Sequence, residues 1–126
     1  MSFGRVGLLE ITLKDSKEFN MPKYLAQGSY SAEGARGLVK EGAVGRRATI
    51  EKLINSMGGS LECMYYAFGD TDVFVIVDMP DNTSVCALTT AINMSGAVCL
   101  RITVLLTVEE VDVASQKLPA YRAPGQ

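Results

Sequence analysis

The clearest pattern of hydrophobic and polar positions lies between residues 61 and 79. Two apolar runs, residues 61–68 and 72–79, are rich in β-branched and aromatic side chains, and the polar turn Gly69-Asp70-Thr71-Asp72 links them. Two such runs around a short Gly-containing turn predict a β-hairpin. We therefore expect this hairpin to form the centre of the fold.

The segment before the hairpin predicts one strand and one interrupted helix. Residues 23–30 have strand character, and Ser31 is a good N-cap for the helix that follows. Ala35, Leu38 and Val39 form an apolar stripe in its first part, but several glycines weaken it, so we expect a break near Gly42. The second part has a cleaner apolar face and ends at a glycine pair: Ile50, Leu53, Ile54, Met57, then Gly58-Gly59.

The segment after the hairpin predicts a helix, a strand and a short terminal helix. Val85, Leu88 and Ile92 mark the buried side of the first helix, and residues 98–106 read as a strand. Thr107 and Glu110 have the spacing of a capping box, so a helix is expected to about Gln116. The Pro-containing end of the chain predicts an extended tail.

These elements define the predicted fold class and domain organisation. From residue 23 to 106 the order is strand, helix, strand, strand, helix, strand, which is the ferredoxin-like βαββαβ order of the α+β class, with a four-stranded antiparallel sheet. Residues 9–14 alternate between apolar and polar, so an extra N-terminal strand is expected there. We divide the chain into an extension over residues 1–20, a domain over residues 21–108, and a helix with tail over residues 109–126.

The alternation within the predicted strands assigns the two faces of the sheet. Val73, Val75 and Val77 are expected to lie under the helices, together with Leu100, Ile102, Val104 and Leu106. The opposite, open face then carries Phe74, Ile76, Cys99, Arg101, Thr103 and Leu105. Because two helices cover only one face, an apolar open face predicts a partner surface, most simply a second copy of the chain.

Composition narrows the classes of function. The net charge of −2 gives no general attraction to nucleic acid or to anionic membranes. The lack of a spanning or secretory segment, with three cysteines outside any C-x-x-C pattern, predicts a cytoplasmic protein with reduced thiols. The absence of His excludes imidazole-based zinc and haem sites and Ser-His or Cys-His catalysis, and we predict neither a metal nor a cofactor.

Candidate chemistry is confined to carboxylates, tyrosines and arginines. Asp70 and Asp72, with Asp78 farther along, are candidates for proton transfer or metal binding, and the alternative is that they cap backbone N–H groups in the turn. Tyr30, Tyr65 and Tyr66 are candidates for lining an aromatic pocket, and packing is the alternative.

Three arginines are candidates for binding an anionic ligand. Arg46 and Arg47 lie near the start of a predicted helix, where solvated or ion-paired side chains are the alternative. Arg101 lies on the otherwise apolar open face, so we expect it to pair with Asp72 or Asp78 or to bind a ligand carboxylate.

A further hypothesis concerns Met21-Pro22. If translation began at Met21, Pro22 would be an N-terminal secondary amine, the type of base that tautomerases use; with residues 1–20 in front of it, that amine does not exist.

An ordered set of short motifs resembles the GYD domain family. The set is Met21-Pro22-Lys23-Tyr24-Leu25, residues 28–34, Arg47, Gly58-Gly59, residues 65–72, Pro80-Asp81-Asn82 and Ser95-Gly96-Ala97-Val98. The resemblance implies a ferredoxin-like domain of the dimeric α+β barrel type, bacterial in most members and without an established activity. It also implies that residues 1–20 are either an extension or the result of a misplaced start codon, because members commonly begin near Met21. Thr71, a candidate binding residue, stands where the family signature has Tyr, so an aromatic ring and a phenol are absent at that position.

Two hypotheses of function remain. In the first, the protein is an oligomeric module that binds a small molecule, such as a small anionic ligand, or another protein at the sheet face. In the second, it is a small cofactor-free enzyme of the dimeric barrel type, an isomerase or monooxygenase, that uses Asp70 or Asp72 with a Tyr and Arg101.

Overall fold

A computed structural model describes residues 21–126 of the chain. The expected strand at residues 9–14 lies outside the described residues. The described elements, in chain order, are β1 (Lys23–Tyr30), α2 (Ala32–Glu41), α3 (Ala43–Ser56), β2 (Ser60–Tyr66), β3 (Val73–Asp78), α4 (Asn82–Met94), β4 (Val98–Leu105) and α5 (Val108–Ser115).

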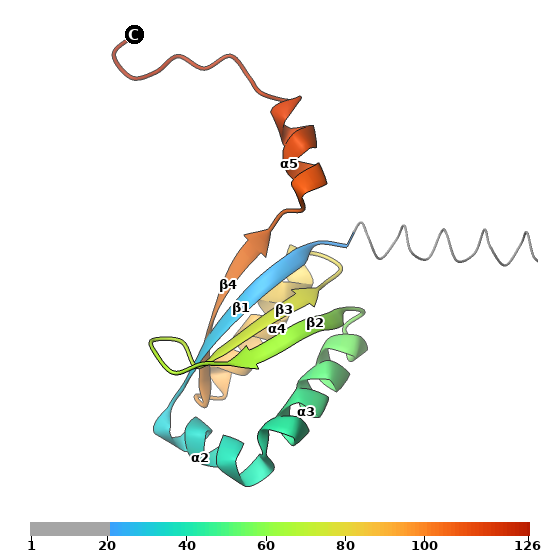
Figure 1. Ribbon diagram of the computed structural model, residues 1–126, viewed down its shortest axis with the longest axis vertical. Helices are drawn as coiled ribbons and strands as arrows, with labels where there is room; N and C mark the ends of the chain where they lie inside the picture. The colour runs from blue at the N-terminus through green and yellow to red at the C-terminus, as the bar shows by residue number, and fades with distance from the viewer. Residues whose placement is uncertain (1–20) are drawn as a thin grey trace, which may run out of the picture.

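The four strands form one open antiparallel sheet in the order β2-β3-β1-β4 (Figure 1). In β1, Leu25 pairs with Ile76 of β3 on one side and Thr103 of β4 on the other. Helix α3 packs against β2 and α4 packs against β4. These findings confirm an α+β chain with a four-stranded antiparallel sheet.

A β-bulge in β2 determines which side chains share a face. Leu61 pairs with Val77, but the next pair joins Cys63 to Ile76, so Glu62 is an extra residue in β2. Beyond the bulge, Cys63 and Tyr65 lie opposite Ile76 and Phe74 on the open face.

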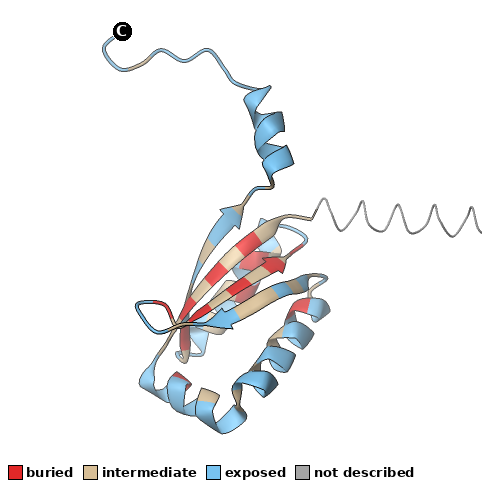
Figure 2. Ribbon diagram, in the orientation of Figure 1, coloured by how far each residue is buried: buried red, intermediate tan, exposed pale blue. Residues whose placement is uncertain are grey.

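The core lies between the sheet and the helices (Figure 2). Val73, Val75 and Val77 are buried as predicted, and they pack with Ile54 of α3 and Val85 of α4. Tyr24 and Met79 are the largest fully buried side chains, and the Tyr24 hydroxyl donates a hydrogen bond to Oδ1 of Asn82. Its polar atom is therefore satisfied inside an apolar layer.

The predicted break in the first helical region occurs at Gly42. This residue has φ of 88°, a conformation that favours glycine, and it separates α2 from α3. The apolar stripe on α2 does not enter the core, because Ala35 and Val39 are exposed, Leu38 is half-buried and only Gly34 of that helix is buried. A Cβ atom on Gly34 would lie 2.0 Å from the Ala97 carbonyl oxygen, so α2 approaches the chain before β4 through glycine and not through a hydrophobic stripe.

The expected burial of β4 holds only in its first half. Leu100 and Ile102 pack against the core, whereas Val104 and Leu106 are 56% and 61% exposed. The reason is position: Val104 lies beside the first turns of α4 on an edge strand, and Leu106 lies beyond the end of β4.

Helix α5 extends from the end of β4, away from the sheet (Figure 1). Its capping box is present: Thr107 accepts from the Glu110 N–H at 3.0 Å, and Glu110 accepts from the Thr107 N–H at 2.8 Å. All residues of α5 are exposed, and no helical or strand structure follows it, as predicted for the tail. No helix within residues 21–126 is long and apolar enough to cross a membrane.

Candidate functional site

The turn between β2 and β3 folds back onto the end of β1. The Asp72 N–H donates to the Gly28 carbonyl at 2.9 Å, and the Ala67 N–H donates to the Asp72 carbonyl at 2.8 Å. The hydroxyl of Ser29 donates to the Asp70 carbonyl at 3.0 Å. These bonds hold the turn over the sheet end, so its side chains have fixed neighbours in β1 and β4.

Thr71 is the residue that this arrangement buries. Only 7% of it is exposed, and its Oγ1 accepts a hydrogen bond of 3.1 Å from Nη2 of Arg101. The expected pairing of Arg101 with Asp72 or Asp78 is wrong, because the guanidinium instead reaches the turn. The hydroxyl of Thr71 thus links the turn to Arg101 of β4.

The carboxylate of Asp72, but not that of Asp70, follows the capping interpretation. Oδ2 of Asp72 accepts a hydrogen bond of 2.8 Å from the Tyr30 N–H, while Asp70 is exposed and uses its backbone carbonyl. Asp78 lies at the far end of the sheet, where Lys23 donates to it at 2.9 Å and also pairs with Glu62. The hydrogen bond to Asp78 and, to a smaller extent, the hydrogen bond to Glu62 raise the pKa of Lys23. Asp78 therefore does not join the turn carboxylates.

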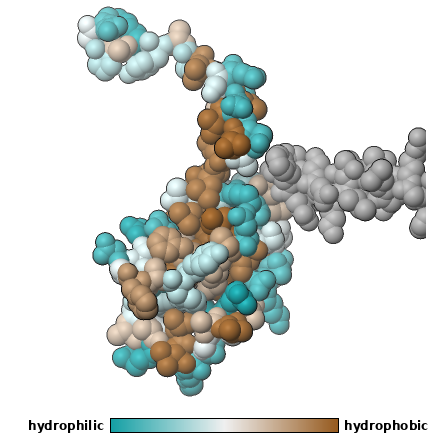
Figure 3. Space-filling model, in the orientation of Figure 1, coloured by the Kyte–Doolittle hydropathy of each residue, from teal (hydrophilic) through white to brown (hydrophobic). Residues whose placement is uncertain are grey.

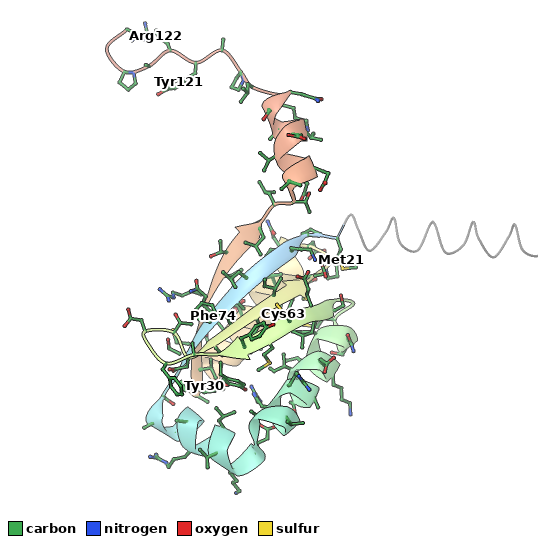
Figure 4. The ribbon with its side chains drawn as sticks, viewed as in Figure 1. Met21, Tyr30, Cys63, Phe74, Tyr121 and Arg122 are labelled. Carbon is green, nitrogen blue, oxygen red and sulfur yellow. The ribbon has the colours of Figure 1, made fainter. Side chains whose placement is uncertain are left out.

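The three candidate tyrosines lie on two faces of the sheet. Tyr65 is exposed on the open face, where it pairs with Phe74 of β3. Figure 4 labels the side chains of Phe74 and Tyr30. Tyr30 packs against the core on the helix side, and Tyr66 makes a side-chain hydrogen bond with it. The structure thus brings Tyr30 and Tyr66 together but separates them from Tyr65.

Arg46 is the arginine beside the two tyrosines. Its Nη1 lies 3.8 Å from Oε1 of Glu41, and its side chain is 27% exposed. Burial of the phenol raises the pKa of Tyr66 to about 12, and the hydrogen bond with Tyr30 is the second cause. The positive charge of Arg46 lowers this pKa but does not outweigh the two. At neutral pH the Tyr66 phenol therefore keeps its proton and is a hydrogen-bond donor.

Arg47 lies on another side of α3. It is exposed and lines a shallow hollow with Glu51 and with Leu61 to Met64 of β2. The sequence contained the signal that separates the two arginines: Arg46 precedes Ile50 by four residues and Ile54 by eight, so it continues the buried stripe of α3. Arg47 is one position out of phase with that stripe.

Two groups of residues therefore stand at the turn end of the sheet. One joins Thr71 of the turn to Arg101 of β4. The other, on the helix side, joins Tyr30, Tyr66 and Arg46. Within residues 21–126, no group of three or more His, Cys, Asp or Glu residues has a geometry that could hold a metal ion.

Residues 24–114 match the sequence model of the GYD domain family. This span runs from the second residue of β1 into α5 and covers most of the chain, which confirms the resemblance seen in the sequence. No curated protein and no solved structure matches the chain.

Proposed function

The chain belongs to the GYD domain family, and from that premise we propose that it is a homo-oligomeric binding module that assembles through its open sheet face. The observation that carries the proposal is the composition of that face. Four half-buried apolar side chains from three neighbouring strands lie there side by side: Leu25, Phe74, Ile76 and Leu105.

No element within residues 21–126 covers these side chains, since α3 and α4 pack on the opposite face. The charged residues of the face lie around these side chains: Lys23 with Glu62 and Asp78 at one end, and Arg101 on the edge strand β4. An apolar centre with charged groups at the margin is the composition of a protein interface. A second copy would remove the centre from water without burying an unpaired charge.

The fold supports the same arrangement. The chain order of strands and helices, with both α3 and α4 on one face, favours a ferredoxin-like domain of the dimeric α+β barrel type as the building block of the assembly. In such an assembly two open faces cover each other, which is an isologous contact.

The arm formed by α5 and the tail, residues 108–126, offers a second unpartnered surface. Val108, Val111, Val113 and Leu118 are exposed, and hydrophobic surface continues from the end of β4 into α5 (Figure 3). An isolated helix of eight residues is marginal in water, so α5 is expected to gain stability from contact with another copy.

The enzyme alternative has weaker support. It requires a carboxylate, a tyrosine and Arg101 to converge on a substrate, but Asp72 accepts the Tyr30 N–H and Arg101 donates to Thr71. Asp70 directs only its backbone toward its neighbours. A binding module is therefore the function that we propose.

A pair of substitutions tests the assembly. Ile76→Lys places a charge in the centre of the open face and is expected to give a monomer by light scattering, with an unchanged far-UV circular dichroism spectrum. Val44→Lys is the control, because Val44 is 75% exposed on α3 and lies away from that face. The same mass for the unmodified chain and for both variants would contradict assembly through the sheet.

A further inference from the structure

A cavity lies between the sheet and the helices α3 and α4. Because α3 packs against β2 and α4 against β4, the central strands β1 and β3 are covered from the two margins of the sheet. The space that remains has a volume of about 60 Å³ and is lined by apolar side chains from both helices and the strands, among them Ile50, Leu53, Ile92 and Leu100.

The size and lining of the cavity fit a small apolar group. Its volume is several times the minimum of roughly 10 to 15 Å³ that one water needs, so the cavity has room for a short aliphatic chain. Cavities lined only by hydrocarbon stay dry and accept apolar ligands. The hydroxyl of Tyr24, one of the few polar atoms in the lining, already bonds Asn82, so it does not call for a water.

The polar groups gather at the end near Tyr30. Tyr30 and Arg46 both line the cavity, and Tyr66 is hydrogen-bonded to Tyr30. The guanidinium of Arg46 carries five N–H donors, yet within residues 21–126 its one charged partner is Glu41, at 3.8 Å, which is beyond hydrogen-bond distance. A partly buried arginine is therefore left with unused donors at the mouth of an apolar space.

We propose that this cleft between α3 and α4 binds a small aliphatic carboxylic acid. The aliphatic body occupies the cavity, and the carboxylate accepts hydrogen bonds from Arg46 and from the hydroxyl of Tyr30, which in turn accepts a hydrogen bond from Tyr66. An arginine and a neutral phenol are donors that suit a carboxylate, and an alcohol or amide of the same length lacks the charge that the guanidinium selects. This inference gives the proposed binding module a ligand class, and it places the ligand on the helix side, away from the oligomer face.

Isothermal titration calorimetry with pentanoate tests the proposal. A ligand of this size is expected to bind with a Kd on the order of 0.1 to 1 mM. Acetate, which lacks the body, and pentanamide, which lacks the charge, are each expected to bind about tenfold more weakly or not at all. Absence of pentanoate binding at millimolar concentration, or equal binding of pentanamide, would overturn the proposal.

The chain supplies matched variants for the same measurement. Arg46→Gln is expected to weaken pentanoate binding about tenfold, whereas Arg47→Gln, its exposed neighbour on α3, is expected to leave binding unchanged. Tyr66→Phe is expected to weaken binding and Tyr65→Phe is not, so the comparison does not depend on a single substitution. Equal affinities within both pairs would refute the assigned site.

The monomeric Ile76→Lys variant separates this proposal from oligomerisation. The cleft and the open face lie on opposite sides of the sheet, so this variant is expected to keep its affinity for pentanoate. Ala26→Val, which adds two methyl groups within the cavity lining, is expected to abolish binding while the oligomer persists. The opposite pattern would show that binding occurs at the sheet face.

Discussion

The guanidinium of Arg101 donates a hydrogen bond to the hydroxyl of Thr71, and this contact ties the turn between β2 and β3 to the edge strand β4. The two residues are far apart in sequence and come from elements that are not neighbours in the sheet. The contact can therefore form only when the turn is folded onto the end of the sheet.

Replacement of Thr71 by Val tests the strength of this contact. The substitution keeps the shape of the side chain and removes the hydrogen bond, so the free energy of unfolding is expected to fall by about 1 kcal/mol. The loss is not larger because Arg101 is exposed and its guanidinium can bond water instead. Urea denaturation measures the change. Thr103→Val, on the same face of β4, is the control and is expected to change stability by less than about 0.5 kcal/mol. Equal effects would mean that the Thr71 contact is not stabilising.

Two glycines in α2 give opposite predictions. Gly34→Ala would place a Cβ atom 2.0 Å from the Ala97 carbonyl oxygen, so a loss of about 1 to 3 kcal/mol is expected from the overpacked contact. Gly37→Ala meets no atom within 4 Å and is expected to gain about 0.4 to 1 kcal/mol, because alanine favours the helix. Thermal and urea unfolding of the two variants measure the difference. A stabilising Gly34→Ala would show that α2 does not approach Ala97 closely.

The titration of Tyr66 predicts a dependence of stability on alkaline pH. The pKa of Tyr66 is about 12 in the folded chain and 10.0 for an unperturbed tyrosine, so the folded state keeps a proton that the unfolded chain loses. Stability is therefore expected to fall as the pH rises from about 10 to about 12, and not below that window.

Tyrosinate absorbance measures the same group directly. Tyr66→Phe is expected to remove one late-titrating tyrosine, whereas Tyr65→Phe is not. Burial also raises the pKa of Tyr24, so a second late component should remain in both variants. Loss of the late component in Tyr65→Phe alone would contradict the position assigned to Tyr66.

The cysteines give a test of surface coverage that needs no substitution. Cys86 lies on α4 and Cys99 on the open face of β4, and both are exposed in the single chain. If a second copy covers the open face, thiol labelling at Cys99 is expected to slow as protein concentration rises, while labelling at Cys86 stays constant. Labelling rates that are independent of concentration at both sites would argue against coverage of that face.

Much of the fold could be predicted from periodicity, whereas the contacts at the site could not. The alternation of Val73, Val75 and Val77 and the capping of α5 are local signals, and both are observed. The contact between Thr71 and Arg101 depends on how the turn folds back over β1, which no local pattern encodes. It is therefore visible only in three dimensions.

Two features of the site could have been predicted from the sequence. Tyr65 and Tyr66 are consecutive in a strand, so they point to opposite faces and cannot line one pocket. Arg46, not Arg47, has the spacing of the buried stripe. The bulge at Glu62 could not be predicted from the sequence, because it depends on the register between β2 and β3.

The mass of the unmodified chain in solution tests the central claim most directly. Light scattering at micromolar concentration is expected to give at least twice the chain mass of 13.5 kDa, because the open face is apolar at its centre and no described element covers it. A mass of 13.5 kDa across that range would show a monomer and would contradict assembly through the sheet face.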